Sequence, residues 1–459
     1  MRRAELGFAL LVVLVMAGAW TLDGLVPSRS IATPVAVSAP GAPLSEAWYC
    51  PAPTAQGLGS TLWTANLGAQ PVHVRRSGTG ASGAQSEADL GPDSSNSAPA
   101  AATAPEGPTA VEAFGQATGS YLSVLTPSAG AASSRCSQQP GTRWIFPIAS
   151  TAPGYDTYLA VTNPFQEEAQ ITVRVLGAKG DQIPSGLNNV DVPQLSQTTL
   201  FLGDFYPATA SVGLDVTATR GRVVVGRLMK VSSREGVRGL TLDVGATAPS
   251  TRWLVPGGDV PAQGEEDVVV ANPSDHEALI STAYQTESGG APAGAQDVPV
   301  PAGSQATLKI SDQVPGGTRH ATVVSSTNGV PVVVERLTVG PQNAYQTVLG
   351  APGTAARWLV AAGSTAGGTD TLALIGEGPD KVTCKVTILS GTGPNVPGPL
   401  AGVEVTPGQR GSVDLTQYLN GQPAMVLVEA TGGKVAVEND LALPATYRQT
   451  VETAGIPLG

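Results

Sequence analysis

Tryptophan recurs along this chain at nearly equal intervals. Three Arg-Trp pairs end at Trp144, Trp253 and Trp358, and Trp48 lies a similar distance upstream, giving intervals of 96, 109 and 105 residues. Each tryptophan opens a stretch rich in valine, threonine and glycine. A unit of about a hundred residues is the size of one β-sandwich domain. The spacing therefore predicts four tandem copies of one β-sandwich unit.

Other markers keep the same register. Asn163 and Asn272, each followed by proline, lie 19 residues after their tryptophans. Arg227 and Arg336, each after a run of valines, lie 83 residues after theirs. The fourth unit carries Asn439 in a weaker copy of that run, and the first unit is irregular, as terminal repeats often are. The markers support one repeated unit whose copies are not strictly equivalent.

The composition agrees with an all-β chain. Glycine (56) and proline (38) are abundant, and no window after the N-terminus has the apolar period of a surface helix. We expect a tandem array of about four immunoglobulin-like or jelly-roll-like sandwiches. The predicted organisation is a hydrophobic segment at 1–26, a Pro/Ala/Ser linker at 27–46, a divergent repeat at 47–142 with a disordered insertion at 77–108, and repeats at 143–251, 252–356 and 357–459.

Eight short strands are predicted in the third unit. They are 253–255, 267–271, 278–285, 296–300, 305–310, 321–326, 330–337 and 345–349. Thr327-Asn328-Gly329 separates the sixth from the seventh, and the neighbouring units have Gly221 and Gly432 at the matching place. Because glycine accepts the positive φ of a tight turn, we expect the two flanking strands to be antiparallel neighbours.

The four repeat tryptophans are predicted to anchor hydrophobic cores. They are Trp48, Trp144, Trp253 and Trp358. Burying one tryptophan removes about 150–250 Å² from water, which is worth roughly 4–6 kcal/mol before entropic corrections. An exposed platform for a ligand is the alternative interpretation of these residues. Residues 382–388 alternate apolar and polar side chains, which is typical of a strand with one face in a core.

An acidic residue follows each of the last three tryptophans by 12 positions. These residues are Asp156, Glu265 and Asp370. They could form structural ion pairs with Arg227 or Arg336, or they could lie in solvated turns. Both interpretations are structural.

The N-terminus predicts export. Arg2 and Arg3 precede an apolar span from Leu6 to Leu22. The span has the minimum length of a membrane-crossing helix, but cleavage near Ala19 would make it a removed signal peptide. A retained helix would anchor the protein in the cytoplasmic membrane with the rest of the chain outside, whereas cleavage would give a secreted protein.

Cysteine usage fits an oxidising compartment. Cys50 and Cys136 bracket the irregular first unit, and we predict a disulfide between them. Two free thiols are the alternative. Cys384 lies in the alternating strand and is expected to be a buried, unpaired thiol.

We identify no residues for chemistry in the sequence. The three histidines, His73, His276 and His320, occupy unrelated repeat positions and lack metal-ligand spacing. We therefore predict no catalytic, cofactor-binding or metal-binding residue. A formal net charge of −11 without clusters of Lys and Arg argues against a nucleic-acid partner.

Several motifs together resemble a known family. They are Trp48-Tyr49-Cys50-Pro51, Arg135-Cys136, Gly141-Thr142-Arg143-Trp144, the Asn-Pro turns, Val300-Pro301-Ala302-Gly303-Ser304 and Val333-Val334-Glu335-Arg336-Leu337. This combination resembles an uncharacterised family of exported actinobacterial proteins, catalogued as a domain of unknown function, and covers most of the chain after Trp48. The resemblance implies tandem extracellular β repeats and a role at the cell envelope. It supplies no catalytic residues.

The expected function is that of a non-enzymatic extracytoplasmic protein, a scaffold or an adhesion and interaction module whose partner is an envelope protein or a glycan. One alternative is a carbohydrate-binding or envelope-glycan assembly accessory, which would use an exposed Tyr155 or Tyr158. A second is a hydrolase with a site between repeats, which would need a deep pocket with clustered acids such as Asp156 and Glu265.

Overall fold

A computed structural model describes residues 45–458, apart from 52–57, 79–84, 100–108, 116–117, 127–129, 179, 364–366, 420, 423 and 444–448. Residues 45–459 form one compact unit. The predicted hydrophobic segment, its cleavage site and nearly all of the linker lie outside the described residues. No helix in the described part of the chain is both long and apolar enough to cross a membrane.

The first sandwich pairs two four-stranded antiparallel sheets. One has the order β1 (Glu46–Cys50), β6 (Thr109–Phe114), β3 (Val72–Gly78), β4 (Gln85–Leu90), and the other β5 (Ser94–Pro99), β2 (Gly59–Asn66), β7 (Thr118–Thr126), β8 (Gly130–Arg135). Strands β4 and β5 correct the sequence prediction, since they lie inside the segment expected to be a disordered insertion. Short polar strands there pair with β3 and β2, which supply the neighbouring apolar residues.

The second and third sandwiches repeat this arrangement. The second consists of β9 (Arg143–Ala149), β15 (Val212–Arg220), β11 (Ala169–Gly177), β12 (Gly180–Gln182) and β13 (Val190–Val192), facing β14 (Ser196–Phe201), β10 (Tyr155–Asn163), β16 (Val224–Ser232) and β17 (Arg238–Val244). The third consists of β18 (Arg252–Asp259), β23 (Arg319–Ser326), β20 (Ala278–Thr286) and β21 (Val298–Val300), facing β22 (Ser304–Lys309), β19 (Glu265–Asn272), β24 (Val333–Val339) and β25 (Tyr345–Leu349). All eight strands predicted for the third unit are present.

The fourth sandwich closes with the end of the chain. One sheet contains β35 (Ile456–Leu458), β26 (Arg357–Ala362), β32 (Ala424–Thr431), β28 (Val382–Ser390), β29 (Gly393–Asn395) and β30 (Val403–Val405). The other contains β31 (Arg410–Asp414), β27 (Thr369–Gly376), β33 (Val435–Ala442) and β34 (Thr450–Ala454). Within the part of the chain that the structure describes, helical structure is limited to 3₁₀ turns at Leu202–Asp204, Pro341–Asn343 and Gly398–Leu400 and to one α-helical turn, α2 (Thr416–Leu419). The all-β prediction is confirmed.

One predicted connection is wrong. Gly221, Gly329 and Gly432 have the expected positive φ, of 76°, 79° and 77°. However, the strands that each turn joins belong to different sheets, as β23 and β24 do. The turn therefore carries the chain across the sandwich instead of forming a hairpin, because the next strand pairs with β19 on the opposite layer.

The repeat markers are core residues with hydrogen bonds in equivalent places. The indole nitrogens of Trp144, Trp253 and Trp358 donate to the carbonyl oxygens of Val223 (2.9 Å), Val332 (2.7 Å) and Val435 (2.6 Å), and that of Trp48 donates to the Thr118 hydroxyl (3.0 Å). The four tryptophans are at most 3% exposed, as predicted for core anchors. The structure contains the Cys50–Cys136 disulfide, and the Cys384 thiol is free and buried.

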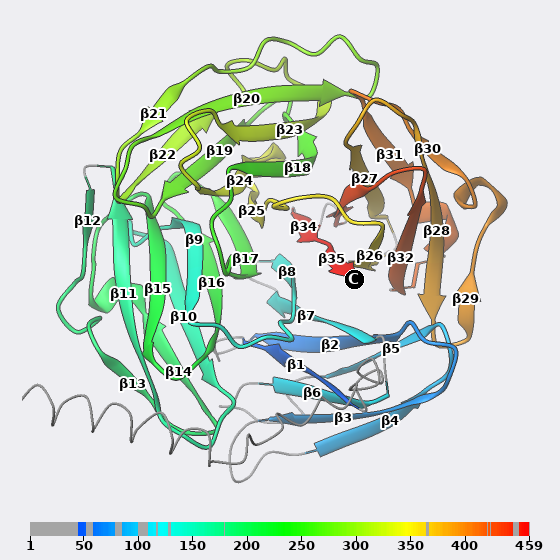
Figure 1. Cartoon of the computed structure of the whole chain (residues 1–459), viewed down its shortest axis with the longest axis horizontal. Coiled ribbons are helices and arrows are strands. Elements are labelled where there is room, and N and C mark those ends of the chain that lie inside the picture. The colour runs from blue at the N-terminus through cyan, green and yellow to red at the C-terminus, as the bar shows by residue number, and fades with distance from the viewer. Residues whose placement is uncertain are drawn as a thin grey trace, which may run out of the picture. The chain divides into compact units, whose positions relative to one another are not determined.

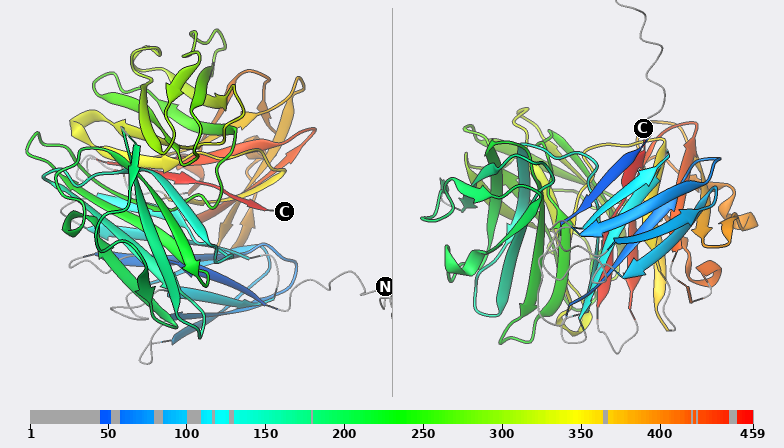
Figure 2. Two further views of the ribbon diagram at one scale, coloured as in Figure 1. Left: turned by 60° about the vertical axis from the view of Figure 1, so that its left-hand side comes forward. Right: turned by 90° about the horizontal axis from the view of Figure 1, so that it is seen from below.

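The four sandwiches contact one another in cyclic order (Figures 1 and 2). We call the sheets that end in β8, β17, β25 and β34 the axial sheets, and the other four the lateral sheets. The four named edge strands contact one another in turn, β8 with β17, β17 with β25, β25 with β34 and β34 with β8. The third axial sheet also contacts the lateral sheet of the second sandwich through β24 and β9, as does the fourth with the third through β33 and β18. A head-to-tail contact of this kind closes when the rotation between successive units completes a turn.

Hydrophobic cores cross these joints. One cluster of buried residues includes Leu122 of the first sandwich, Leu228 of the second and Leu359 of the fourth. Another joins Ile145 and Leu176 of the second sandwich to the core of the third. Described residues 45–458 therefore form one body whose repeats share apolar surface.

Candidate functional site between the third and fourth sandwiches

One position in each axial sheet reaches the preceding sandwich. The residue there is Tyr121, Gly226, Glu335 or Glu438, in order along the chain. The Tyr121 hydroxyl donates to the carbonyl oxygen of Leu359 (2.8 Å). A Cβ on Gly226 would lie only 2.6 Å from the Pro51 carbonyl oxygen, so glycine permits the close contact there. The two glutamates instead bring charge into their joints.

Glu335 holds the joint between the second and third sandwiches. Its carboxylate accepts from Arg227 at 2.6 and 2.9 Å and from the backbone N–H of Ile148 at 3.1 Å. Arg227 also reaches Asp243 (3.3 Å) and the Thr347 hydroxyl (3.0 Å), and its side chain is fully buried. Burial alone would lower the pKa of Arg227, but Glu335 and then Asp243 raise it. The guanidinium is therefore charged and paired inside the joint.

Arg336 takes the same part in the next joint, where it faces three carboxylates. Its Nη2 lies 2.5 Å from Glu438, 3.0 Å from Glu452 and 3.7 Å from Asp440. Burial would lower the pKa of Arg336, while Glu438, Glu452 and Asp440 raise it. The backbone N–H of Gly257 donates to Glu438 at 3.1 Å, the counterpart of the bond from Ile148 to Glu335.

This joint places three carboxylates, Glu438, Glu452 and Asp440, around one arginine, Arg336. Burial, followed by the neighbouring Glu438, raises the pKa of Asp440, although Arg336 lowers it. Burial also raises the pKa of Glu452, again opposed by Arg336. A second cation, Arg410, has a buried side chain, with only 1% exposed. Arg410 donates to the Pro256 carbonyl (2.8 Å) and to Glu287 (2.5 Å), and its Nη2 lies 3.8 Å from Asp440.

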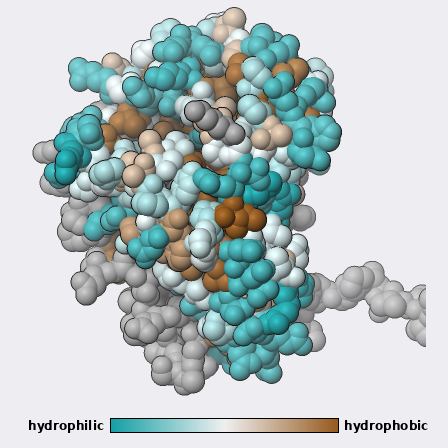
Figure 3. Space-filling view, turned by 90° about the vertical axis from the view of Figure 1, so that its left-hand side faces the viewer, coloured by the Kyte–Doolittle hydropathy of each residue, from teal (hydrophilic) through white to brown (hydrophobic). Residues whose placement is uncertain are grey.

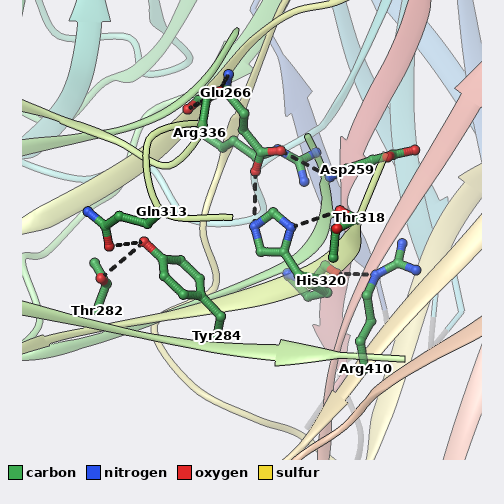
Figure 4. Close-up of polar contacts among 12 residues, drawn as sticks. Asp259, Glu266, Thr282, Tyr284, Gln313, Thr318, His320, Arg336 and Arg410 are labelled. Carbon is green, nitrogen blue, oxygen red and sulfur yellow. Dashed lines mark hydrogen bonds and ion pairs between the residues drawn. The ribbon is translucent and has the colours of Figure 1, made fainter. Parts of the chain in front are cut away.

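A sealed His–Glu pair lies behind these charges (Figure 4). Nε2 of His320 is 3.4 Å from Oε1 of Glu266, and neither side chain is exposed. Nδ1 of His320 lies 3.3 Å from the Thr318 carbonyl, which only accepts, so Nδ1 carries the proton. Burial lowers the pKa of His320 to about 4 and raises that of Glu266 to about 8. Burial thus favours the neutral form of both groups.

A pocket of about 440 Å³ opens beside the cluster, between the third and fourth sandwiches. Its charged lining comprises Asp259, Arg319, Arg410, Asp440 and Glu452, with Gln342, Gln346 and Gln449 among the polar residues. Arg319 and Asp259 are half-exposed and 3.8 Å apart. The pocket therefore has walls of both charge signs, and none of its described lining residues is aromatic.

The equivalent joint between the second and third sandwiches holds a different pocket. It has a volume of about 580 Å³, and Tyr155, Tyr345, Glu235, Glu265 and Asn343 are among its lining residues. The rings of Tyr155 and Tyr345 meet edge to face with centroids 5.8 Å apart. Tyr158, the other tyrosine singled out from the sequence, instead packs on Phe201 with centroids 5.0 Å apart.

The acids picked out from the sequence do not pair with the repeat arginines. Arg227 binds Glu335 and Asp243, and Arg336 binds the acids of the fourth sandwich. Asp370 instead accepts from the backbone N–H of Gly363 (2.8 Å). Asp156 lines neither pocket, so it does not join Glu265 in a cluster. Of the two interpretations given from the sequence, the ion pairs with Arg227 or Arg336 are contradicted, because those arginines meet other carboxylates.

The glutamates at the joints, Glu335 and Glu438, were not predicted from the sequence. Glu335 directly precedes Arg336, and neighbouring residues of a strand face opposite sides of its sheet. Glu335 therefore cannot share the environment of Arg336 and must meet a different partner. The Val-Val-Glu-Arg run contained this signal, and Glu438 repeats it in the last unit. Among described residues, no group of three or more His, Cys, Asp or Glu side chains is arranged to hold a metal ion.

The comparisons place the chain in a family. A model of a family of unknown function (DUF5719) matches residues 90–340, which is more than half of the chain, so the chain belongs to this family. No curated protein matches the sequence. Among solved structures, a Thermotoga maritima protein, 1070, is 21% identical over 22% of this chain and 94% of its own, with a TM-score of 0.20. The Anabaena sensory rhodopsin transducer is 25% identical over 20% of this chain and 99% of its own, with a TM-score of 0.18.

Arg336, buried in the joint between the third and fourth sandwiches, gives a stability prediction. We expect Arg336→Met to lower the free energy of unfolding by about 3–5 kcal/mol, because it leaves Glu438 and Glu452 buried without their cation. The control Arg319→Met removes a half-exposed partner and should cost at most about 1 kcal/mol. Denaturant unfolding measures both. Equal effects of the two substitutions would contradict a structural role for the buried pair.

The His–Glu pair predicts a pH dependence. The folded-state pKa of Glu266, about 8, exceeds its ordinary value of 4.5, so the folded state holds a proton that the unfolded state loses between these values. Stability contributed by this group therefore falls as pH rises from about 5 to 8. We expect Glu266→Gln, which replaces the carboxyl with an uncharged group of nearly the same shape, to remove that fall. Unfolding measured from pH 5 to 9 tests this, and a parallel decline in both proteins would refute it.

Proposed function

We propose that this member of a family of unknown function is a non-enzymatic extracytoplasmic protein that serves as a scaffold or interaction module of the cell envelope. Its partner is an envelope protein or a glycan. Cyclic closure of the four sandwiches is the observation that carries the proposal. Because each sandwich is held on two sides, surfaces from different repeats keep fixed positions relative to one another.

Two further observations support it. The Cys50–Cys136 disulfide is a feature typical of oxidising compartments. Exposed large hydrophobic residues, which include Phe114, Ile183 and Leu195, are scattered, and on the face in Figure 3 hydrophilic residues cover most of the surface. A surface of this kind suits a module that meets its partners in an aqueous environment.

The location is tested in cells that express the full chain. We expect protease added to intact, wall-stripped cells to reach the protein, and we expect Cys50 and Cys136 to resist alkylation until they are reduced. Mass spectrometry of the mature N-terminus separates a retained anchor from cleavage near Ala19. A protected chain with both thiols free would refute an extracytoplasmic role.

A glycan-binding role is the second candidate, and the pocket at Tyr155 favours it. Aromatic faces stack on sugar rings, and the carboxylates of Glu235 and Glu265 with the Asn343 amide can accept or donate hydrogen bonds to hydroxyls. The volume of about 580 Å³ is within the range of small-ligand sites. The pocket thus combines an aromatic wall with polar groups.

Binding to bacterial envelope polysaccharides tests this role. We expect Tyr155→Ala to weaken binding roughly tenfold, the loss of about one aromatic contact. Tyr158→Ala is the matched control, since Tyr158 lies outside the pocket, and should bind as the wild type does. Equal affinities of all three proteins would argue against this pocket.

A further inference from the structure

The 440 Å³ pocket between the third and fourth sandwiches has no part in the proposed scaffold role. It lies within the size range of small-molecule sites, about 300–1,000 Å³. Strands β25, β27, β33 and β34, the end of β18 and the start of β31 supply most of its walls, with single residues from β23 and β24. These elements belong to two sandwiches, so the joint described above fixes the geometry of the pocket.

Buried polar groups in this pocket lack partners. Gln346 is only 4% exposed, and among the described residues its Nε2 amide has no hydrogen-bond partner. Oδ1 of Asp440 is likewise buried without a hydrogen bond within the described chain. A buried polar group that is not hydrogen-bonded costs about 1–3 kcal/mol. Both residues line the pocket, so an occupant that reaches these covered atoms, accepting from Gln346 and donating to Asp440, would recover this free energy.

Arg410 adds a cation to the same wall. Its side chain is 1% exposed, yet its Nη2 lies 3.8 Å from Asp440, too far for a hydrogen bond. Asp440 also lies 3.7 Å from Arg336, so neither arginine hydrogen-bonds it. The pocket thus presents a carboxylate that can take a donor and a guanidinium and an amide that can take an acceptor.

We propose that this pocket binds a small zwitterion of the amino-acid class. The ligand's ammonium group donates to Asp440 and approaches Glu452, and its carboxylate accepts from Gln346 and Arg410. A purely cationic ligand would lie beside Arg410 and Arg319, and a purely anionic one would lie beside Asp440 and Glu452. A zwitterion satisfies both signs, and the acceptor-donor pattern of the unpaired atoms matches it.

Isothermal titration of the full chain with a panel of free L-amino acids at pH 7 tests the proposal. We expect at least one to bind, and we expect its N-acetyl form, which lacks the ammonium, and its amide, which lacks the carboxylate, each to bind at least about tenfold more weakly. Glucose serves as an uncharged polar probe and should not bind. Failure of every amino acid, equal binding of a blocked form, or binding of glucose alone would each overturn the proposal.

Two variants locate the site. Gln346→Leu removes the unpaired amide and should weaken binding by about tenfold while the protein remains folded by circular dichroism. Asp440→Asn should have an effect at least as large, through loss of the ammonium partner. Glu404→Gln, in an exposed ion pair on the fourth sandwich, is the control and should leave affinity unchanged. Binding that survives both Gln346→Leu and Asp440→Asn would place the ligand elsewhere and overturn the assignment.

Discussion

The buried pairing of an arginine in one sandwich with a glutamate from the next is the interaction on which the arrangement of the repeats depends. Arg227 with Glu335 and Arg336 with Glu438 occupy equivalent positions in successive joints. Removing two charges from water is expensive, and attraction between them repays that cost only when their geometry is well satisfied. Each glutamate therefore also accepts a backbone N–H from the preceding sandwich, Ile148 or Gly257. Such a pair tolerates one relative placement of the two sandwiches, which hydrophobic contact alone would not specify.

The other two joints use different chemistry at the same position. The joint between the first and second sandwiches places Gly226 against Pro51, and that between the fourth and first uses the Tyr121 hydroxyl. Asn439 stands where the other late repeats have arginine, and the first unit has Leu122 there. The fourth sandwich thus lacks the arginine, and the first sandwich, which it meets, has Tyr121 in place of the glutamate. Apolar residues from the first, second and fourth sandwiches form one cluster around these joints. The first and fourth sandwiches, which depart most from the repeat pattern, are consequently the ones whose surfaces meet to close the cycle.

Local patterns in the sequence predicted most of the fold, and contacts between repeats explain most of what they missed. The tryptophan spacing, the eight strands of the third unit and the disulfide depend on short-range periodicity or on cysteine usage. The turn at Gly329 was misread because positive φ fixes the turn but not which sheet receives the next strand. Strands β4 and β5 were missed because polar residues form them against apolar neighbours. The site was predictable only in part: Arg336 was marked, but its partners Glu438 and Glu452 lie in the next sandwich, about a hundred residues away.

Closure of the cycle also explains why equivalent joints carry unlike pockets. Each joint is held by a few buried contacts, so the other residues that line it can differ without loosening the body. The pocket between the second and third sandwiches contains Tyr155 and Tyr345, whereas the pocket between the third and fourth contains Arg410, Asp440 and Gln346. A third pocket, where the fourth sandwich meets the first, is lined by Trp63 and mainly apolar neighbours. One repeated backbone geometry therefore presents an aromatic, a charged and an apolar recess at three successive joints. Ligand recognition by a chain of this kind should be sought between the repeats, because the interior of each repeat is filled by its own tryptophan-led core.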